Sequence, residues 1–381
     1  MNDNLLQWIE IDSSALDHNI KKIRTVIGAD KKLLVLVKAN AYGHGIVEIS
    51  RLALKSGADW LGVHSIEEGI LLRKQGFKCP VLIVGYVPLA KLEEAVKGDL
   101  KLTVYNTETI ERLASVCHSL KKKAFLHLKL ETGTHRQGIN KKDVLSFVRK
   151  IKENPYLVAE GISSHFANIE DTTDHSYAKL QKENFNSILY QLEKNKIAIP
   201  LKHMSCTASA ILFKETHFNM VRTGIGIYGL WPSKQTYLSS LLNEGKPIGL
   251  KPVLSWKTRI AQLKDVPEGA YIGYGCTYRT TRRTKLAVLP VGYYDGYSRS
   301  LSNRSHVIVK GKRAPLRGRV AMNFIVVDVT DIEGVQLEDE AVLLGKEGKE
   351  TVSADYLASL IGTINYEIVT RINPKIPRIT K

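Results

Sequence analysis

An alternation of short apolar runs with amphipathic stretches constrains the fold of residues 1–240 more than any other feature of this chain. The apolar runs, which are typical of strands, are Leu33–Lys38, Asp59–His64, Val81–Gly85, Lys101–Tyr105, Ala124–Leu130, Val158–His165, Leu201–Cys206 and Val221–Tyr228. Helical patterns between them include Ser65–Gln75, Thr107–Leu120, Lys142–Lys152 and His175–Asn195. Strands that alternate with helices predict parallel βαβ units, and eight such units predict a closed (β/α)8 TIM-like barrel. A doubly wound open sheet is the competing α/β architecture, although it requires no particular number of strands.

From about residue 245 the pattern changes to β segments separated by Gly and Pro turns. These segments are Val253–Leu263, Lys285–Val291, His306–Val309, Phe324–Val329 and Glu340–Leu344. Only Ala354–Ile361 has a clear helical pattern. We therefore predict a barrel over residues 1–240 and a mostly β C-terminal domain over residues 241–381. The segment Leu6–Ile11 precedes a helix that Ser13 or Ser14 would cap, so residues 1–11 are a candidate strand of the β domain.

Composition places the chain among ordinary globular proteins. It has 381 residues, of which 44% are hydrophobic and 24% charged, and this length suffices to bury a core without disulfides. The four cysteines are scattered and form no C-x-x-C pair, so we expect free thiols in a reducing compartment and no metal site. No signal peptide is visible, and no apolar run reaches the roughly 18 residues of a membrane helix, so we expect a cytoplasmic protein.

The net charge of +17 is the unusual number in the composition. Such a charge can indicate an anionic partner, for example nucleic acid, a membrane surface or a phosphorylated ligand. The lysines are spread along the chain, however, and no nucleic-acid-binding motif accompanies them. A solvated basic surface is therefore the favoured interpretation, with neither nucleic acid nor a membrane as partner.

Lys38 ends the first apolar strand, Leu33–Val37. Catalytic groups of (β/α)8 barrels lie at the C-terminal ends of the strands, so Lys38 is a candidate for Schiff-base chemistry. To react it must lose a proton, which costs roughly 4.6 kcal/mol at pH 7 unless its surroundings help. Position alone favours the simpler interpretation, a lysine that caps a strand end.

The sequence around Lys38 reverses that preference. Val37-Lys38-Ala39-Asn40-Ala41-Tyr42-Gly43-His44-Gly45 resembles the cofactor-lysine signature of the alanine racemase family, which are barrel-type pyridoxal-phosphate enzymes. The resemblance extends over nearly the whole chain at matching spacings. It implies pyridoxal 5′-phosphate as the cofactor, held on Lys38, and the interconversion of L- and D-alanine. The product D-alanine would supply cell-wall peptidoglycan.

The fifth strand carries the next candidate residues. Phe125, His127 and Lys129 alternate with leucines and so face one way. The resemblance implies that Lys129 is carbamylated and positions Arg136, in the following segment. Arg136 would then contact the phenolic oxygen of the cofactor and the substrate carboxylate, a task that suits a planar guanidinium. Without the flanking motif, Arg136 is an ordinary surface-loop arginine.

The sixth and eighth strands end in candidate cofactor ligands. The resemblance implies that Arg222 binds the pyridine nitrogen of the cofactor, with His165 supporting it. An arginine does not give up its proton readily, so the ring would remain a weak electron sink. Gly224 and Ile225 would offer backbone N–H groups to the phosphate, which the small size of glycine permits.

Three hydroxyl groups complete the implied phosphate site. They belong to Tyr42, Thr207 and Tyr366. Family members usually carry an Asn-Ser pair where Cys206 and Thr207 stand here, so this chain keeps the hydroxyl and loses an amide.

The predicted β domain supplies the second catalytic base in the implied scheme. Tyr274, within Tyr271–Tyr278, would remove the proton on one face of the substrate while Lys38 serves the other, because inversion requires two opposed groups. Taken alone, Tyr274 is equally well interpreted as a turn aromatic. Met322 would direct its backbone N–H toward the substrate carboxylate. In the family the second-base tyrosine reaches the other subunit's site, so the resemblance implies a homodimer.

Other functions remain open at this level. Departures from the family pattern leave a racemase of serine or of broader specificity possible; they lie at Thr134, His135, Gln137, Cys206 and Asn323. A related pyridoxal-phosphate decarboxylase is a second alternative, although Arg222 opposes the strong electron sink that decarboxylation needs. A cofactor carrier without turnover is a third, and the β domain with Tyr274 argues against it.

Overall fold

The computed structural model describes residues 4–245 and 247–381, and the chain divides into two compact units. One unit, here the barrel unit, comprises Ala15–Ala41 and Ile49–Lys251. The other, here the β unit, comprises the N-terminal segment to Ser14, Tyr42–Glu48 and Pro252–Lys381. The boundary expected at residue 240 falls inside a helix, and no sequence pattern indicated that Tyr42–Glu48 would belong with the β unit.

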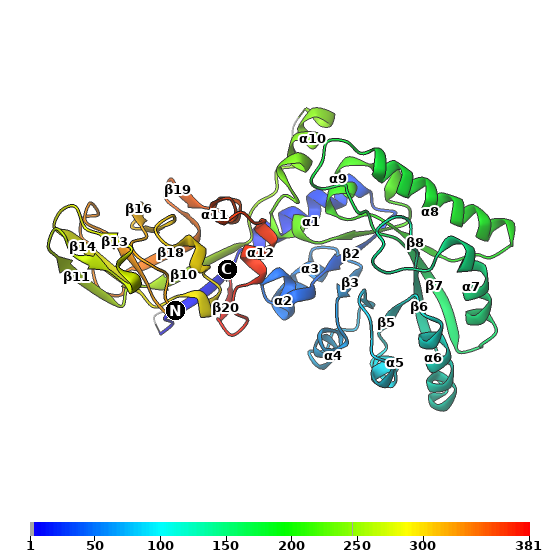
Figure 1. Ribbon diagram of the computed structural model, residues 1–381. Coiled ribbons are helices and arrows are strands. Elements are labelled where there is room, and N and C mark those ends of the chain that lie inside the picture. Colours follow the sequence, from blue (N-terminus) through cyan, green and yellow to red (C-terminus); the bar gives the residue numbers. More distant parts are fainter. Residues whose placement is uncertain (1–3, 246) are drawn as a thin grey trace. The chain divides into compact units, whose positions relative to one another are not determined.

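Eight parallel strands form the sheet of the barrel unit, as the sequence predicted (Figure 1). They are β2 (Lys32–Leu36), β3 (Trp60–Val63), β4 (Val81–Ile83), β5 (Lys101–Val104), β6 (Ala124–Lys129), β7 (Leu157–Ser163), β8 (Leu201–His203) and β9 (Met220–Thr223). Neighbours in sequence pair from β2 through β8, and β9 returns to pair with β2. Within the described residues β8 and β9 share no ladder of backbone hydrogen bonds, so the barrel is nearly closed, with one seam.

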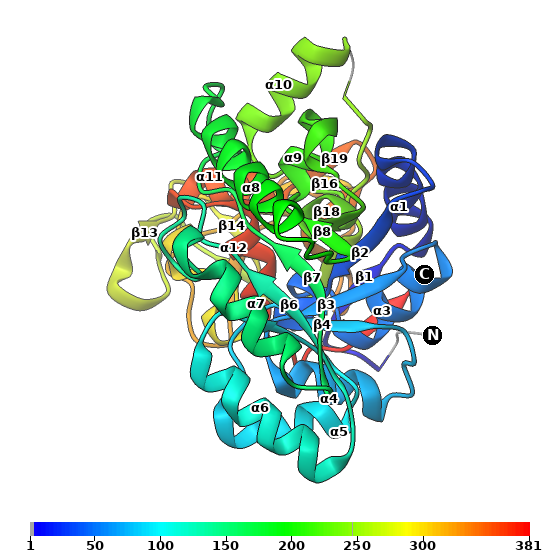
Figure 2. The same ribbon diagram turned by 90° about the vertical axis from the view of Figure 1, so that its right-hand side faces the viewer.

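Helices surround the strands of the barrel unit (Figure 2). The helices here are α1 (Ser13–Ile27), α3 (Ile46–Lys55), α4 (Ile66–Lys74), α5 (Leu92–Lys97), α6 (Thr107–Leu120), α7 (Val144–Lys152), α8 (Ser176–Lys194), α9 (Thr207–Leu212) and α10 (Lys234–Glu244). Their sequences explain their placement: α7 buries Val144, Phe147, Val148 and Ile151, which is the i, i+3, i+4, i+7 spacing of a one-sided helix. Ser65 and Glu68 form a capping box that starts α4. The four helical predictions for this region are confirmed, with ends shifted by at most two residues.

The β unit contains three sheets. The largest has the order β16-β15-β18-β10-β1-β20, with β19 added to β18. Its strands are β1 (Gln7–Ile11), β10 (Leu254–Arg259), β15 (His306–Val309), β16 (Lys312–Pro315), β18 (Glu340–Glu347), β19 (Glu350–Val352) and β20 (Arg378–Thr380). The smaller sheets contain β11 (Gln262–Val266), β14 (Thr284–Leu289) and β17 (Ile325–Asp328), and β12 (Tyr271–Ile272) with β13 (Tyr278–Arg279). β1 pairs with β10 and β20, so the N-terminal segment adds a strand to this sheet.

Two helices belong to the C-terminal part of the β unit, where the sequence suggested only one. α11 (Ala354–Ile361) has the expected bounds, and α12 (Asn365–Thr370) follows it. The second helix is six residues long, too short for a periodic pattern to identify.

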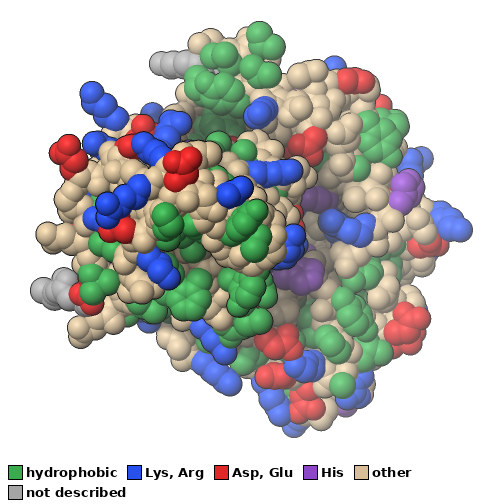
Figure 3. Space-filling view, turned by 60° about the vertical axis from the view of Figure 1, so that its left-hand side comes forward, with side chains coloured by type: hydrophobic (Ala, Val, Ile, Leu, Met, Phe, Trp, Pro, Cys, Tyr) green, Lys and Arg blue, Asp and Glu red, His purple; other side chains and the backbone are tan. Residues whose placement is uncertain are grey.

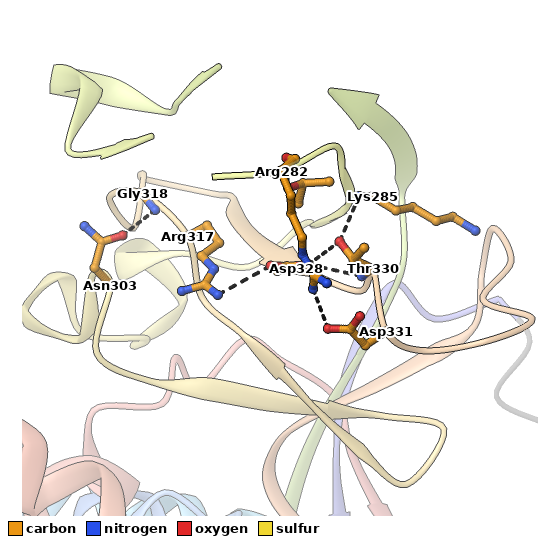
Figure 4. A network of polar contacts seen from close by, with 9 residues as sticks. Arg282, Lys285, Asn303, Arg317, Gly318, Asp328, Thr330 and Asp331 are labelled. Carbon is orange, nitrogen blue, oxygen red and sulfur yellow. Dashed lines mark hydrogen bonds and ion pairs between the residues drawn. The ribbon is translucent and has the colours of Figure 1, made fainter. Parts of the chain in front are cut away.

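A network of polar contacts fixes the turn after β17 (Figure 4). The Asp328 carboxylate accepts hydrogen bonds from the Thr330 hydroxyl (2.6 Å) and the Thr330 backbone N–H (3.1 Å), and it faces the Arg317 guanidinium at 3.4 Å. In the same region Asn303 Oδ1 accepts from the backbone N–H of Gly318 (2.6 Å). These contacts hold Arg317 and Gly318, at the start of the segment that leads to Met322.

Charged side chains of both signs lie on the face of the molecule that Figure 3 shows. Among the described residues, none of the helices is long and apolar enough to cross a bilayer. Lysines and arginines are scattered over the face seen in Figure 3, with aspartates and glutamates between them. On this face the positive charge is therefore dispersed.

Candidate active site

The strand ends of the barrel unit enclose a cavity of about 230 Å³. Its walls come from all eight strands or the turns that follow them: Leu36, Lys38, His64, Leu82, Val84, Thr103, Lys129, Arg136, Gln137, Ser163, His165, His203 and Arg222. Five of these were candidates from the sequence. Two lysines and two arginines face the cavity, whereas the described residues that line it include no carboxylate. A cavity of this charge favours an anionic ligand.

Lys38 follows β2 at the edge of this cavity. Burial, and then the nearby charge of Arg136, lower the pKa of Lys38, while Glu68 acts in the opposite direction. The surroundings therefore supply part of the deprotonation that a lysine nucleophile needs.

A left-handed turn fixes the backbone after Lys38. Residues 39–42 of α2 (Lys38–Tyr42) all have φ of 52–53° although none is glycine. Such a conformation costs roughly 1–2 kcal/mol per residue. The Glu68 carboxylate anchors the turn, because it accepts hydrogen bonds from the backbone N–H groups of Ala39 (2.6 Å) and His64 (2.8 Å). Strained backbone of this kind is concentrated at functional sites.

Lys129 lies at the end of β6, between two guanidinium groups. Burial, followed by the charges of Arg222 and Arg136, holds the pKa of Lys129 well below its ordinary value. Within the described chain its amine makes no ion pair or hydrogen bond. An amine in this position is uncharged more readily than an ordinary lysine.

Backbone hydrogen bonds join the two ends of the loop that carries Arg136. The backbone N–H of Glu131 donates to Ile139 O (3.0 Å), and the N–H of Ile139 donates to Lys129 O (2.8 Å). Gly138 makes this closure possible, since a Cβ there would lie 2.4 Å from the backbone nitrogen of Glu131. Inside the loop the Glu131 carboxylate accepts from the N–H groups of residues 133 and 134 at 2.5 and 2.7 Å. Arg136 is thus presented by an ordered loop, with its side chain facing the cavity.

Arg222, on β9, bridges the seam of the barrel. Its Nη1 donates to the backbone oxygen of His203 (2.9 Å) and to His203 Nδ1 (2.6 Å). Its Nη2 donates to the backbone oxygens of Ser164 (2.8 Å) and Met204 (3.1 Å). A guanidinium has five N–H donors, so within the described chain these four bonds leave only the Nε–H for a ligand. Burial lowers the pKa of Arg222 to about 10, which still leaves it charged at neutral pH.

The histidine that contacts Arg222 differs from the expected one. We expected His165 to support Arg222, but the described residues contain no hydrogen bond between these two side chains. His165 lines the same cavity, and burial together with the charge of Lys129 lowers its pKa well below the ordinary value. His203 holds Arg222 instead and continues to His127. The alternation of β6, which places His127 beside Lys129 on one face, was the only sequence signal for this pair.

Thr207 and the glycines after β9 converge at one point. The buried Thr207 hydroxyl accepts hydrogen bonds from the backbone N–H of Gly224 (3.1 Å) and of Gly226 (3.4 Å). Gly226 must lack a side chain, because a Cβ would lie 2.5 Å from Thr207 Cγ2. Thr207 and Gly224, each expected to bind the phosphate, are therefore neighbours, and Ile225 is buried beside them.

Cys206 begins α9 where the family usually has an amide side chain. Burial raises the pKa of the Cys206 thiol to about 11, so the side chain stays uncharged at neutral pH. Its backbone N–H donates to Ser209 Oγ (2.9 Å). Cys206 thus contributes an uncharged side chain at the N-terminus of α9.

Tyr42 and Tyr366 meet in the β unit. Their ring centroids lie 6.1 Å apart with the planes tilted by 49°. The two expected phosphate ligands are therefore neighbours, although they come from α2 and α12.

The segments that carry Tyr274 and Met322 lie side by side in the β unit. Gly318 has φ 78°, and a Cβ there would lie 2.6 Å from the Ile272 oxygen. At Gly275 a Cβ would lie 2.8 Å from the Arg319 guanidinium. The Tyr274 side chain is 74% exposed and that of Met322 is 55% exposed. Both groups are available to a ligand or to another chain.

Two family models match the chain. Residues 11–232 match the alanine racemase N-terminal domain, and residues 253–380 match the alanine racemase C-terminal domain. The chain belongs to the alanine racemase family. An alanine racemase of Methanococcus maripaludis is 41% identical over 98% of both chains. One of Halothermothrix orenii is 42% identical over 97% of this chain and 96% of its own length.

Solved structures of family members have the same fold. An alanine racemase of Clostridium difficile 630 superposes with a TM-score of 0.93, at 32% identity, over 99% of this chain and 96% of that one. The alanine racemase of Bacillus anthracis with bound L-Ala-P gives 0.91 at 33% identity, over 99% and 95%. The family resemblance and the barrel-plus-β-domain architecture expected from the sequence are both confirmed.

Proposed function

We propose that this chain is a pyridoxal 5′-phosphate-dependent alanine racemase that uses Lys38 and Tyr274 as its two bases. The observation that carries the proposal is the cavity at the barrel mouth. It combines a lysine of lowered pKa with an arginine that has one donor left for a ligand. The family to which the chain belongs supplies the reaction, and the cavity supplies residues suited to it.

The cavity fits the cofactor in charge and in donors. Pyridoxal phosphate carries a phosphate and a phenolic oxygen, and four cationic side chains face the cavity without a lining carboxylate. The Arg222 Nε–H is suited to donate to the pyridine nitrogen. Thr207 and Gly224 are suited to one side of the phosphate, with Ile225, Tyr42 and Tyr366 as further predicted ligands. When joined to the substrate amine in place of Lys38, the cofactor would withdraw electrons from the substrate α-carbon.

Arg222 limits how strongly that withdrawal acts. It stays charged at neutral pH and gives no proton to the ring nitrogen. A modest electron sink suits proton exchange at the α-carbon better than decarboxylation. This is the physical reason for preferring the racemase to the related decarboxylase.

Lys38 and Tyr274 move the proton. For L-alanine, a Tyr274 phenolate would take the α-proton from one face and become a phenol, and a protonated Lys38 would give its proton to the opposite face and become a neutral amine. The reverse sequence converts D-alanine to L-alanine. Two opposed groups are needed, since one base that returns its proton to the same face regenerates the starting enantiomer.

Arg136 and Met322 are the proposed ligands of the substrate carboxylate. A guanidinium can bind a carboxylate with two parallel hydrogen bonds, and the loop closure described above presents Arg136 in a defined position. Carbamylation of Lys129 would place a negative charge between Arg136 and Arg222. That charge would replace an amine whose pKa both arginines lower.

A homodimer completes the proposed site. The exposure of Tyr274 leaves its phenol free to enter the cavity of a second copy of the chain. Each dimer would then contain two sites, each with Lys38 from one copy and Tyr274 from the other.

Loss of the α-proton to deuterated solvent tests the proposal. L-alanine, L-serine and L-lysine are incubated with the cofactor-loaded enzyme, and the products are separated on a chiral column. We expect fastest exchange with alanine and the appearance of D-alanine. Exchange with none of the three, despite bound cofactor, would refute the racemase assignment, and faster exchange with serine would change the substrate.

Two variants with matched controls test the bases. Lys38→Ala should abolish the visible absorbance of the lysine-bound cofactor, whereas Lys32→Ala, at the exposed start of the same strand, should keep it. Tyr274→Phe should keep the absorbance and cripple conversion of L- to D-alanine. Tyr271→Phe, also exposed, should change neither. Normal racemisation by Tyr274→Phe in both directions would contradict the two-base scheme.

A further inference from the structure

A row of buried hydrogen bonds leads from Arg222 away from the cavity. Arg222 Nη1 lies 2.6 Å from His203 Nδ1, and His203 Nε2 lies 2.8 Å from His127 Nδ1. His127 Nε2 then lies 3.3 Å from Glu160 Oε2. Glu160 belongs to β7, and it is the only member of the row with substantial solvent contact, its side chain being 19% exposed.

The arginine end fixes the direction of the row. A guanidinium only donates, so His203 Nδ1 must accept and carry no hydrogen. A neutral His203 then carries its hydrogen on Nε2 and donates it to His127 Nδ1. By the same argument His127 carries its hydrogen on Nε2 and donates it outward to Glu160. Burial lowers the pKa of both histidines, which favours these neutral forms.

The carboxylate end independently requires the same direction. An ionised carboxylate only accepts, so His127 must donate from Nε2 and accept at Nδ1. His203 must then donate from Nε2 and accept at Nδ1. We propose that Glu160 is a positioning residue, which acts through His127 and His203 to hold Arg222 with its Nε–H directed at the ligand.

The strand geometry around Glu160 is built for this contact. The pairing of β6 with β7 shifts between Leu126 and His127, which leaves Glu160 unpaired as a β-bulge. Bulges redirect a side chain from the regular alternation. Next to it, a Cβ at Gly161 would lie 2.3 Å from His127 Nδ1, so the imidazole packs on bare backbone. Trp60 covers the ring from another side, with centroids 5.6 Å apart.

Loss of the acceptor at position 160 would be transmitted to Arg222. The His127 Nε2–H would have no partner in a buried place, which favours moving the hydrogen to Nδ1. That hydrogen would face the Nε2–H of His203, which would have to change its tautomer as well. The new Nδ1–H of His203 would then oppose Arg222 Nη1–H and displace the guanidinium.

This role rests on the proposed function only in what Arg222 does for the cofactor. The tautomers themselves can be measured without turnover, so failure of one proposal is distinguishable from failure of the other. Nitrogen-15 NMR of histidine-labelled enzyme, with and without pyridoxal phosphate, separates Nδ1–H, Nε2–H and doubly protonated rings. We expect His127 and His203 both to be neutral with the hydrogen on Nε2, and a hydrogen on Nδ1 of either ring would overturn the proposal.

Two substitutions of Glu160 separate its acceptor from its size. Glu160→Leu removes the acceptor. We expect altered nitrogen shifts at His203 and a shifted visible absorbance of the bound cofactor. We also expect a roughly 10-fold lower kcat, which is the size of effect found for residues that orient metal ligands. Glu160→Gln keeps an oxygen that accepts from His127, and it should retain the wild-type tautomers and most of the activity.

Asp59→Asn is the matched control. Asp59 is a half-buried carboxylate of the same barrel that binds Arg24 (2.7 Å) and the backbone N–H of Leu33 (2.8 Å), outside the row. The Asp59→Asn substitution should leave the histidine nitrogen shifts and the visible absorbance of the cofactor unchanged. The proposal is overturned if Glu160→Leu leaves the histidine shifts and the absorbance at wild-type values. It is also overturned if Glu160→Gln or Asp59→Asn changes these two signals as much as Glu160→Leu does.

Discussion

Replacement of Thr207 by valine should destabilise the barrel unit and weaken cofactor binding together. The buried Thr207 hydroxyl accepts from the backbone N–H groups of Gly224 and Gly226 at 3.1 and 3.4 Å. Valine keeps the shape of the side chain but leaves both N–H donors without an acceptor. A buried donor without an acceptor costs about 1–3 kcal/mol. Because the second bond is long, we expect the free energy of unfolding to fall by about 2–4 kcal/mol. With a urea slope of about 3 kcal/mol per M, the unfolding midpoint falls by roughly 1 M.

Thr207→Ser is the control, because it keeps the hydroxyl and removes only the methyl group that packs on Gly226. One buried methyl is worth roughly 0.8 kcal/mol. Urea unfolding of the cofactor-free proteins measures both stabilities, and titration with pyridoxal phosphate measures Kd. Valine should raise Kd by about 10-fold or more, since hydrogen bonds to charged groups contribute about 1.5–3 kcal/mol. Equal stability and equal Kd for Thr207→Val and wild type would refute the assignment of this hydroxyl.

Three further changes have defined outcomes. Ala39→Gly should stabilise the cofactor-free protein by about 0.5–1 kcal/mol in urea unfolding, because glycine relieves a left-handed φ of 53° and loses part of the gain to the freer unfolded chain. Lys129→Met should stabilise the cofactor-free, CO2-free protein at pH 7. The folded-state pKa of Lys129 is lowered, so the lysine destabilises the folded state at any pH below its unfolded-state pKa of about 10.4. The advantage of methionine should therefore shrink as pH rises toward about 10. A mixture of inactive Lys38→Ala and Tyr274→Phe proteins, allowed to exchange subunits, should regain about a quarter of wild-type racemase activity, because half of the dimers are hybrids with one intact site.

Each of these three has a contrary result. A less stable Ala39→Gly protein would show that the left-handed turn is not strained. A stability difference between Lys129→Met and wild type that does not change with pH would remove the buried charge as its cause. Hybrid dimers without activity, when native mass spectrometry with one variant tagged confirms exchange, would place both bases of a site in one chain.

The fold was predictable from the sequence where periodicity is strong. Eight apolar runs of parallel strands and one-sided helices such as α7 give clear signals. The turn after Lys38 gives little, because only Asn40 in Ala39–Tyr42 readily adopts a left-handed backbone and none of the four is glycine. The contact that anchors it comes from Glu68, 29 residues away. Tertiary contacts of this kind override local preference.

The site was predictable to the level of strand ends. Lys38, Lys129, Arg136, His165 and Arg222 were expected at the barrel mouth and all line one cavity. Their proposed roles came from the family resemblance, not from spacing. His203 was missed because an isolated buried histidine carries no sequence signal. Its importance follows from its two ring nitrogens, which join Arg222 to His127.

Arg222 shows why an arginine, and not a lysine, suits this position. Backbone carbonyls just beyond the ends of β7 and β8 lie outside the strand ladder, and a buried carbonyl needs a donor. The planar guanidinium donates to the backbone oxygens of Ser164 and Met204 and to one imidazole nitrogen, and also to the His203 oxygen, which accepts from the Ser164 N–H as well. A three-donor ammonium cannot make all four bonds. These four bonds fix the plane of the group and therefore the direction of the remaining Nε–H. The contacts that close the barrel thus also determine which donor a ligand meets, so stability and cofactor geometry depend on the same side chain.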